Sequence, residues 1–517
     1  MAFLWSTEAL PLEVTSFLPV VLLPLLGILD TGEVSEQYFT GANMMFLAAM
    51  GVAAAVQSVG LHKRVALRIL MATGTGKKSL LFSFMFITTL LSMFICNTAT
   101  TAMIIPILQV VLDQIYPKPS SQEKDETDSK KNKQDKIATS HNQEKIMFYL
   151  AIGYSANIGG TGTLTASAPN VILKGTLKEL FPCQNDLTYA TWLLYALPII
   201  VVVIILAYFW LMCLFMGRGK EGNKLEIKSF LKEKYVDLGP IKFQEIMVGF
   251  YFFLLVVIWF FEEPEFIKGW ADFFKLEDGN PAIDEATPAV FILILLFITP
   301  RHLNFWPFID KDAPWDVVVL PPTLLDWSTV THFFPWGLLI LRGAGFALAK
   351  ASIESGLSDW LGVQLSSLSS LPNWGILTLV CLITSLVTEV CSNSATANIL
   401  FPVLAGLAVE QEINPLYLML PAAVTCCYAF MLPVSCPPNA IVYKASGMDT
   451  RHMIMAGLGL NILTLVVNIL AANTYGSPLM DFKEFPVWAW ANLTENCTVM
   501  GAGLKFPSYF LNFNKNT

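Results

Sequence analysis

The chain has 517 residues and a formal net charge of −8, with 54% hydrophobic and only 14% charged residues. Its mean hydropathy of +0.57 exceeds what a soluble core of this length could bury. Composition therefore excludes a soluble enzyme and a nucleic-acid-binding protein, and it predicts an all-α polytopic membrane protein. The cysteines lie mostly inside apolar stretches without metal-ligand spacing, although Cys183 and Cys497 lie in predicted loops and could pair.

The N-terminal part contains two predicted spans, Pro11 to Leu29 and Met44 to Gly60, since about 20 apolar residues cross a bilayer. We expect no signal peptide here, because a basic region ahead of an apolar stretch and a small-residue cleavage site are not visible. The next stretch, Leu61 to Lys78, carries basic residues and no acidic one, so it is predicted to face the cytoplasm.

A long apolar segment from Leu80 to Ile115 comes next, and the charged stretch 117–144 follows it. The low hydrophobicity of 117–144 predicts a disordered cytoplasmic insertion. Both ends of the apolar segment then lie inside the cell. Either two full spans with a short polar outer loop, or a re-entrant hairpin with a polar tip, satisfies this pattern.

The segment from Tyr149 to Leu180 is apolar at both ends and is interrupted by Gly159 to Thr163 and by Pro169-Asn170. A break of this kind frees backbone carbonyl groups inside the membrane, where they can bind cations. A packing kink with small residues at a helix contact is the alternative.

Five further spans are predicted from apolar length, and the charges of the loops between them set their orientation. The loop 217–234 is rich in lysine and is predicted inside, whereas 262–285 is rich in acids and is predicted outside. The alternation of loop charges predicts an outer C-terminus, and the sequons at Asn492 and Asn496 agree with it because they can accept glycan only on the outer side. Together with the two N-terminal spans and one broken segment in each repeat, these five spans make nine complete spans, and we expect two hairpins besides. The five further spans are Trp192 to Met216, Ile246 to Phe261, Pro288 to Ile298, Trp336 to Ala351 and Met453 to Ala472.

A polar motif occurs twice in the chain, as Cys96-Asn97-Thr98-Ala99-Thr100 and as Ser392-Asn393-Ser394-Ala395-Thr396. In each copy a proline follows nine positions after the asparagine. A second motif trails each copy, Ser167-Ala168-Pro169-Asn170 and Ser435-Cys436-Pro437-Pro438-Asn439. No Lys or Arg occurs from Ala351 to Tyr443, so the second copy enters from outside and the repeat is inverted.

Inverted repeats with broken helices are typical of secondary transporters, which bind substrate near the membrane midplane between the repeats. Asparagine oxygens, hydroxyls and free carbonyls suit Na⁺, while helix N-termini suit an anion. The two copies contain no Lys, Arg or His, so an anion held there needs bound cations to offset its charge. No Walker motif is present, and we expect an ion gradient to supply the energy.

Several motifs resemble the divalent-anion:sodium symporters, which include the sodium-coupled di- and tricarboxylate transporters and the INDY proteins. The resemblance covers nearly the whole chain and implies sodium-coupled uptake of succinate, citrate and related acids by a homodimer in the plasma membrane, with an elevator-like movement of a transport domain. Sulfate transport and a truncated, non-transporting membrane subunit are the alternatives. Besides the repeated motifs, the family resemblance rests on four stretches: Thr7 to Leu12, Leu61 to Arg68, Pro335-Trp336-Gly337 and Gly345 to Lys350.

The resemblance also implies binding sites. One sodium ion is expected at Ser92, Cys96, Asn97 and Ala166, and a second at Thr388, Cys391, Asn393 and Ser435. Substrate contacts are expected from Asn97, Thr98, Ser167, Ser392, Asn393, Ser394, Cys436 and Pro437.

The chain departs from the family pattern at a few positions. Cys96, Ala166 and Cys436 replace the usual serine, glycine and threonine, and Arg342 lies in a span that is otherwise uncharged. The family's first span and most of its second are expected to be missing. The resulting division is 1–78 for N-terminal scaffold spans, 79–180 for the first repeat, 181–351 for connecting spans, 352–445 for the second repeat and 446–517 for the last span and tail.

Overall fold

The computed structural model describes residue 4 and residues 9–73, 76–116, 128–181, 184, 186–216, 224–262, 269–274, 283, 285–302, 322–357 and 371–489. Helices are the regular elements of this part of the chain, apart from one isolated bridge between Pro300 and Thr323. The prediction of an all-helical membrane fold is confirmed. The sequons at Asn492 and Asn496, and both Cys183 and Cys497, lie outside the described residues.

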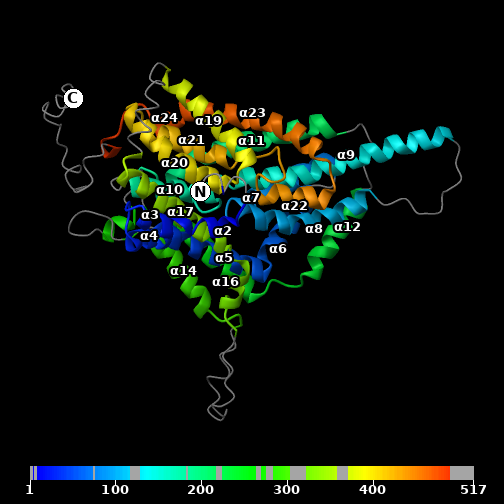
Figure 1. Ribbon diagram of the computed structural model, residues 1–517. Helices are drawn as coiled ribbons and strands as arrows, with labels where there is room; N and C mark the ends of the chain where they lie inside the picture. The colour runs from blue at the N-terminus through cyan, green and yellow to red at the C-terminus, as the bar shows by residue number, and fades with distance from the viewer. Residues whose placement is uncertain are drawn as a thin grey trace, which may run out of the picture.

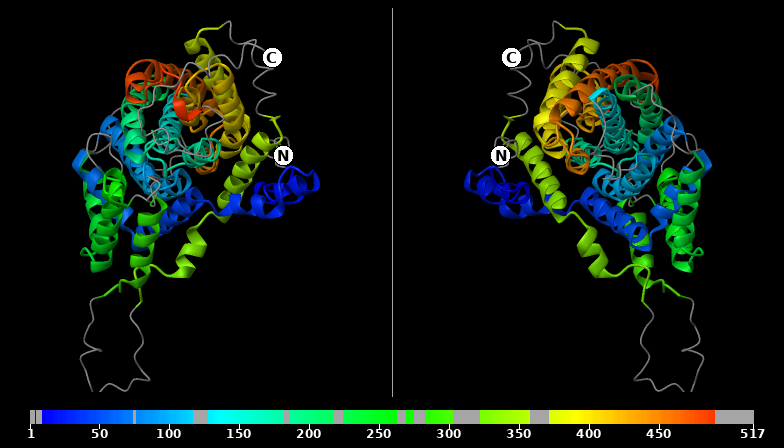
Figure 2. Two further views of the ribbon diagram at one scale, coloured as in Figure 1. Left: turned by 90° about the vertical axis from the view of Figure 1, so that its left-hand side faces the viewer. Right: turned by 90° about the vertical axis from the view of Figure 1, so that its right-hand side faces the viewer.

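Two groups of helices pack within themselves (Figures 1 and 2). The first group, which we call the first bundle, lies mainly in the lower part of Figure 1. It consists of α2 (Leu12–Thr15), α3 (Leu18–Leu25), α4 (Thr31–Glu36), η1 (Gln37–Phe39), α5 (Gly41–Val59), α6 (Leu61–Thr73), α12 (Lys224–Asp237), α13 (Phe243–Phe260), α14 (Ala286–Ile298), α16 (Trp327–Phe333) and α17 (Trp336–Glu354).

The other group, the second bundle, contains both copies of the repeat. Its helices are α7 (Lys77–Ser92), α8 (Asn97–Ile115), α9 (Asp128–Gly159), α10 (Ala168–Leu180), α11 (Tyr189–Phe215), α19 (Asn373–Val390), α20 (Asn393–Glu410), α21 (Pro415–Cys426), α22 (Pro437–Ser446), α23 (Thr450–Asn473) and α24 (Gly476–Leu479). The helices α11 and α23 pack against α9, α19 and α21. We therefore place these two helices with the repeats and not with the connecting spans.

Five helical stretches in the described residues are long and apolar enough to cross a membrane. The stretches Trp327–Phe333 and Trp336–Ser352 meet at a bend of 67° and together pass the same test. The expected total of nine spans stays a prediction. The five stretches are Thr31–Val59, Tyr189–Phe215, Phe243–Phe260, Asn373–Val390 and Thr450–Asn473.

The segment from Leu80 to Ile115 forms a helical hairpin, α7 and α8, with its tip at Met93 to Cys96. The two ends of the hairpin meet at Glu144 of α9, which accepts hydrogen bonds from Lys77 Nζ at 2.6 Å and from the Tyr116 hydroxyl. With 16 residues, α7 is about 24 Å long, less than the roughly 30 Å of a bilayer core. A re-entrant hairpin explains this length better than two full spans do.

The prediction of disorder across 117–144 is wrong from Asp128 onward, where α9 begins. The stretch from Lys130 to Lys145 contains many residues of good helix propensity, such as lysine and glutamine, which explains how α9 extends beyond the apolar segment. Helix α9 ends at Gly159 and α10 begins at Ala168, so the predicted break in the segment from Tyr149 to Leu180 is confirmed. The second repeat has the same break between Cys426 and Pro437.

Candidate functional site

The tip of the first hairpin is fastened to the first helix break by Ser92 and Asn97. The buried Ser92 hydroxyl lies 3.0 Å from Asn97 Oδ1 and 2.7 Å from the carbonyl oxygen of Ala156. A Cβ atom on Gly160 would lie 2.3 Å from Asn97 Oδ1, so only glycine allows the asparagine to lie against the break. The tip and the broken helix therefore form one packed unit.

The second hairpin repeats this arrangement with a threonine. The Thr388 hydroxyl lies 3.1 Å from Asn393 Oδ1 and 2.8 Å from the carbonyl oxygen of Cys426. In both copies the hydroxyl residue stands five positions before the asparagine. The same side-chain geometry thus supports both copies of the motif.

A second asparagine in each copy holds the non-helical break in shape. Asn170 Nδ2 donates to the carbonyl oxygens of Gly160 at 2.9 Å and Thr163 at 2.8 Å. Asn439 Nδ2 donates to the carbonyl oxygens of Ala429 at 2.9 Å and Leu432 at 3.2 Å. In both copies the acceptors stand ten and seven positions before the asparagine, so the internal repeat extends to individual hydrogen bonds.

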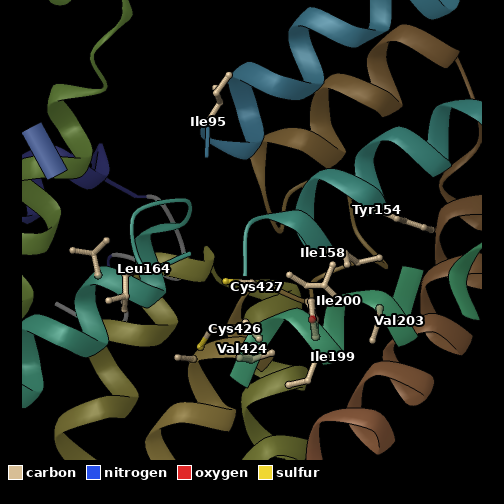
Figure 3. Packing of buried hydrophobic residues seen from close by; sticks show 14 of the residues in the cluster. Ile95, Tyr154, Ile158, Leu164, Ile199, Ile200, Val203, Val424, Cys426 and Cys427 are labelled. Carbon is tan, nitrogen blue, oxygen red and sulfur yellow. The ribbon is translucent and has the colours of Figure 1, made fainter. Parts of the chain in front are cut away.

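The two copies contact each other at their breaks. Asn157 Nδ2 of the first copy lies 3.2 Å from Cys436 Sγ and 3.4 Å from Asn439 Oδ1 of the second. In the opposite direction, Cys427 Sγ lies 3.3 Å from Ser167 Oγ. Figure 3 shows the apolar packing next to this junction, where Cys426, Cys427 and Val424 lie in the same buried cluster as Ile158 and Ile199.

Four helices begin at the predicted site, namely α8, α10, α20 and α22. Helix α8 packs against α22 and α10 packs against α20, so each of these helices lies beside one from the other repeat. Among the N-cap residues, Ser392 accepts a hydrogen bond from Ala395 N at 3.3 Å, whereas Cys96, Ser167 and Cys436 make no such bond. The free N–H groups at helix N-termini favour an anion.

The structure brings the predicted site residues together at the hairpin tips and the breaks. Five of the fourteen stand at solvent-accessible positions of intermediate burial: Cys96, Thr98, Ser167, Ser392 and Asn393. Pro437 is exposed at the start of α22. The remaining eight are buried: Ser92, Asn97, Ala166, Thr388, Cys391, Ser394, Ser435 and Cys436.

Besides Asn157 at the junction of the two copies, the sequence interpretation missed Glu389. Its buried carboxylate accepts hydrogen bonds from the backbone N–H groups of Phe430 at 2.8 Å, Met431 at 3.0 Å and Leu432 at 3.2 Å. Asn461 Nδ2 of α23 donates to the same carboxylate at 2.5 Å. An acidic residue inside an apolar segment, next to Thr388, was the signal that could have identified it.

The charges of the site favour cations. No Lys, Arg or His occurs in the stretches 92–101, 155–170, 388–398 and 426–439, while Glu389 contributes a carboxylate. In the described part of the chain, no three His, Cys, Asp or Glu side chains are grouped as for a transition metal. Hydroxyl, amide and carbonyl oxygens are the donors that remain, and they suit a hard cation such as Na⁺.

A family profile described as the sodium:sulfate symporter transmembrane region matches residues 1–482. The chain is 38% identical to the Na⁺/citrate cotransporter of Rattus norvegicus, over 96% of this chain and 92% of the relative. It is 36% identical to solute carrier family 13 member 2 of Homo sapiens, over 98% and 92%, and 36% identical to the human Na⁺/dicarboxylate cotransporter 3, over 95% and 88%.

The fold is also similar to a solved structure. The YdaH transporter of Alcanivorax borkumensis matches with a TM-score of 0.52 and 14% sequence identity, over 86% of this chain and 88% of that one. At this identity the match concerns the fold alone.

Proposed function

The chain belongs to the divalent-anion:sodium symporter family, and from this we propose that it is a sodium-coupled secondary symporter, without enzymatic activity, that carries di- or tricarboxylates into the cell. It is a multi-pass membrane protein, and sodium is the co-transported ion. Succinate, citrate and related acids are the proposed substrates, because the similar proteins are named for citrate and dicarboxylates. We place it in the plasma membrane as a homodimer.

The observation that carries the proposal is the pairing of four helix N-termini with a site that has no basic side chain. An anion with two or three charges is attracted by the N–H groups of α8, α10, α20 and α22. Those partial charges do not balance a dianion next to Glu389. Bound Na⁺ supplies the missing positive charge, which makes transport of the anion depend on sodium.

Two sodium sites are supported by the repeated hydrogen bonds. The Ser92 and Asn97 side chains lie together at the first site, where Cys96 and the backbone of Ala166 complete the proposed ligand set. The Thr388 and Asn393 side chains lie together at the second, which Cys391 and Ser435 complete. The substrate then lies between the tips, in contact with Asn97, Thr98, Ser167, Ser392, Asn393, Ser394, Cys436 and Pro437.

We assign the movement to the second bundle as a whole. The hairpins, the broken helices, α11 and α23 pack on one another, and the site lies wholly among them. A unit of this kind can carry its site past a fixed first bundle, as in an elevator-like transporter. The Lys174–Glu285 ion pair, at 3.2 Å, joins α10 of the second bundle to the start of α14 in the first. This ion pair then breaks during each transport cycle.

Sulfate is the second candidate substrate, because the family profile is named for it. A non-transporting subunit is disfavoured by the complete pair of hydrogen-bonded sites and by the match to about nine-tenths of the relatives' length.

Uptake of labelled succinate, citrate and sulfate into proteoliposomes tests the proposal. We expect uptake of the carboxylates in Na⁺ and little in Li⁺ or choline, and we expect the substrate concentration for half-maximal uptake to rise as sodium falls. Uptake that is equal without Na⁺, or a substrate affinity that does not change with sodium, would contradict the coupling. Uptake of sulfate alone would assign the second candidate.

A further inference from the structure

Arg342 lies in the middle of α17 and its side chain is fully buried. Its guanidinium group packs over the ring of Phe46 in α5, with 4.3 Å between the guanidinium carbon and the ring centroid. Nη2 donates a hydrogen bond to the carbonyl oxygen of Ala42 at 3.1 Å. Helix α17 lies beside the N-terminal helices in Figures 1 and 2, and it also packs against α10 and α20 of the second bundle.

The charge of Arg342 is not balanced by the residues around it. Nε and Nη1 have no hydrogen-bond partner, and none of the ion pairs found in the described residues involves Arg342. The other buried arginine is paired, since Arg64 Nε lies 2.6 Å from Glu245, and the half-buried Lys77 is paired as well, with Nζ 2.6 Å from Glu144.

The neighbours of Arg342 along α17 are apolar or small. Leu341, Ala344 and Ala347 belong to a buried apolar cluster, and a Cβ atom on Gly343 would lie 2.5 Å from the Tyr38 ring. The carbonyl oxygen of Leu341 is already occupied, since it accepts a hydrogen bond from Asn398 Nδ2 at 3.1 Å. A charged guanidinium in such surroundings is strongly destabilising unless a counter-charge reaches it.

We propose that Arg342 binds a small inorganic anion, of the class of chloride, between α5 and α17. One negative charge neutralises the guanidinium, and the N–H groups of Nε and Nη1 are the donors for it. Because the guanidinium is fully buried, it is closed to a lipid headgroup at the surface, and its two unpaired donor groups suit a small anion better than a tricarboxylate. This anion is a resident of the first bundle and is separate from the transported substrate.

Thermal unfolding of the purified protein in detergent tests the site. The sodium concentration is held constant and substrate is omitted, while sodium chloride replaces sodium gluconate in steps. Gluconate serves as the reference anion because it is too large to reach the buried guanidinium. We expect the unfolding midpoint to rise with chloride, by roughly 1–2 °C at ten times the dissociation constant, and to continue rising with the logarithm of the chloride concentration above it. Arg342→Met removes the dependence, whereas Arg451→Met, at an exposed position of α23, leaves it intact.

A second variant and a direct probe guard against misfolding. Arg342→Lys keeps the positive charge but has fewer N–H donors, so the same rise of the unfolding midpoint should require more chloride. In crystals grown in sodium bromide, we expect an anomalous peak next to the guanidinium. A midpoint that does not change with chloride in the wild type, or that changes equally in Arg342→Met, would overturn the proposal and would mean that water alone satisfies these donors. Sodium-coupled uptake measured in gluconate is an independent readout of the transport function.

Discussion

Each repeat depends on two asparagines whose side chains hold it in different ways. Asn97 and Asn393 offer their oxygens to a hydroxyl at the hairpin tip, while Asn170 and Asn439 donate to the carbonyl groups of the break. An oxygen that accepts from one hydroxyl retains a lone pair for a cation. In the proposed sodium sites, the hydroxyl residues therefore orient the asparagine oxygen as well as fasten the tip.

We predict that Ser92→Ala and Thr388→Val each weaken sodium binding. Loss of one buried hydrogen bond removes about 1 kcal/mol, which corresponds to a roughly fivefold higher sodium concentration for half-maximal uptake. Thr384→Val is the matched control, because the Thr384 hydroxyl donates at 2.8 Å to the carbonyl of Val380 in its own helix. Sodium titrations of succinate uptake measure the effect, and an equal change in the control would remove the assignment.

Cys96 gives the opposite prediction. It is the N-cap of α8 and makes no side-chain cap bond, whereas its counterpart Ser392 accepts one from Ala395 N. Serine at position 96 restores a cap, which stabilises a helix by about 1 kcal/mol, and it offers Na⁺ an oxygen in place of sulfur. We expect Cys96→Ser to lower the sodium concentration for half-maximal uptake severalfold.

Cys436→Thr, which faces the proposed anion, is expected to act mainly on substrate affinity. A small thiol reagent should block the wild type, and substrate with sodium should protect it. Unchanged sodium dependence in Cys96→Ser, together with full reagent sensitivity in the double variant, would exclude these residues from the site.

Among the helical elements, the second break is held differently from the first. The carboxylate of Glu389 binds three successive N–H groups of the second break, whereas the residue at the same position of the first copy is Met93. In the first copy the Thr163 hydroxyl donates to the carbonyl oxygen of Met93 at 2.5 Å instead. Of the two proposed sodium sites, the second thus has a carboxylate at a position where the first has Met93.

We predict that Glu389→Gln damages the second site more than the first. Glutamine has one acceptor oxygen where the carboxylate has two, and it has no charge, so hydrogen bonds worth about 3 kcal/mol are weakened. Uptake should fall at least tenfold while the protein still reaches the membrane. Surface biotinylation separates these effects, and Glu410→Gln at an exposed position of α20 is the control. Normal sodium affinity in Glu389→Gln would assign the carboxylate to folding alone.

The connection from the first bundle to the first hairpin is the helix α6, and Arg64 fixes it. Arg64 binds both oxygens of Glu245, at 2.6 and 3.1 Å, and donates to the carbonyl of Gly239 at 2.9 Å. Because α6 leads directly into α7, this contact anchors the connection to α13.

We predict that Arg64→Met lowers the free energy of unfolding by about 3–5 kcal/mol, since it leaves Glu245 buried and unpaired. The double variant Arg64→Met/Glu245→Met should recover much of this loss. Thermal unfolding measures both, with Arg68→Met as the control because Arg68 has only an exposed bond to the Tyr235 hydroxyl. A double variant as unstable as the single one would show that the carbonyl contacts dominate.

At the scale of the whole molecule, the charges of the loops predict the orientation in the membrane. The basic stretch around Leu61 to Lys78 is assigned to the cytoplasm, and the tail with Asn492 and Asn496 is assigned to the exterior. We expect glycan on at least one of these asparagines, and we expect a C-terminal tag to be open to protease in intact cells. Loss of the mass shift in Asn492→Gln/Asn496→Gln checks the glycan, and a protected tag would reverse the assignment.

The sequence by itself determined the fold class, the repeat and the paired motifs. Apolar length and loop charge depend on the chain alone, and two motifs of the same residues in the same order fold to the same local hydrogen bonds. The family resemblance added the site residues, and Ser92 with Asn97 and Thr388 with Asn393 are indeed in contact.

Only the tertiary structure decided which segments meet. The contacts of Glu389 with Phe430 and of Cys427 with Ser167 join positions 41 and 260 residues apart, which no local pattern encodes. The extension of α9 back to Asp128 was hidden because low hydrophobicity describes a solvated helix as well as a disordered chain. The burial of Arg342 without an ionic partner among the described residues was likewise invisible, since the packing of α17 on α5 determines which side chains surround it.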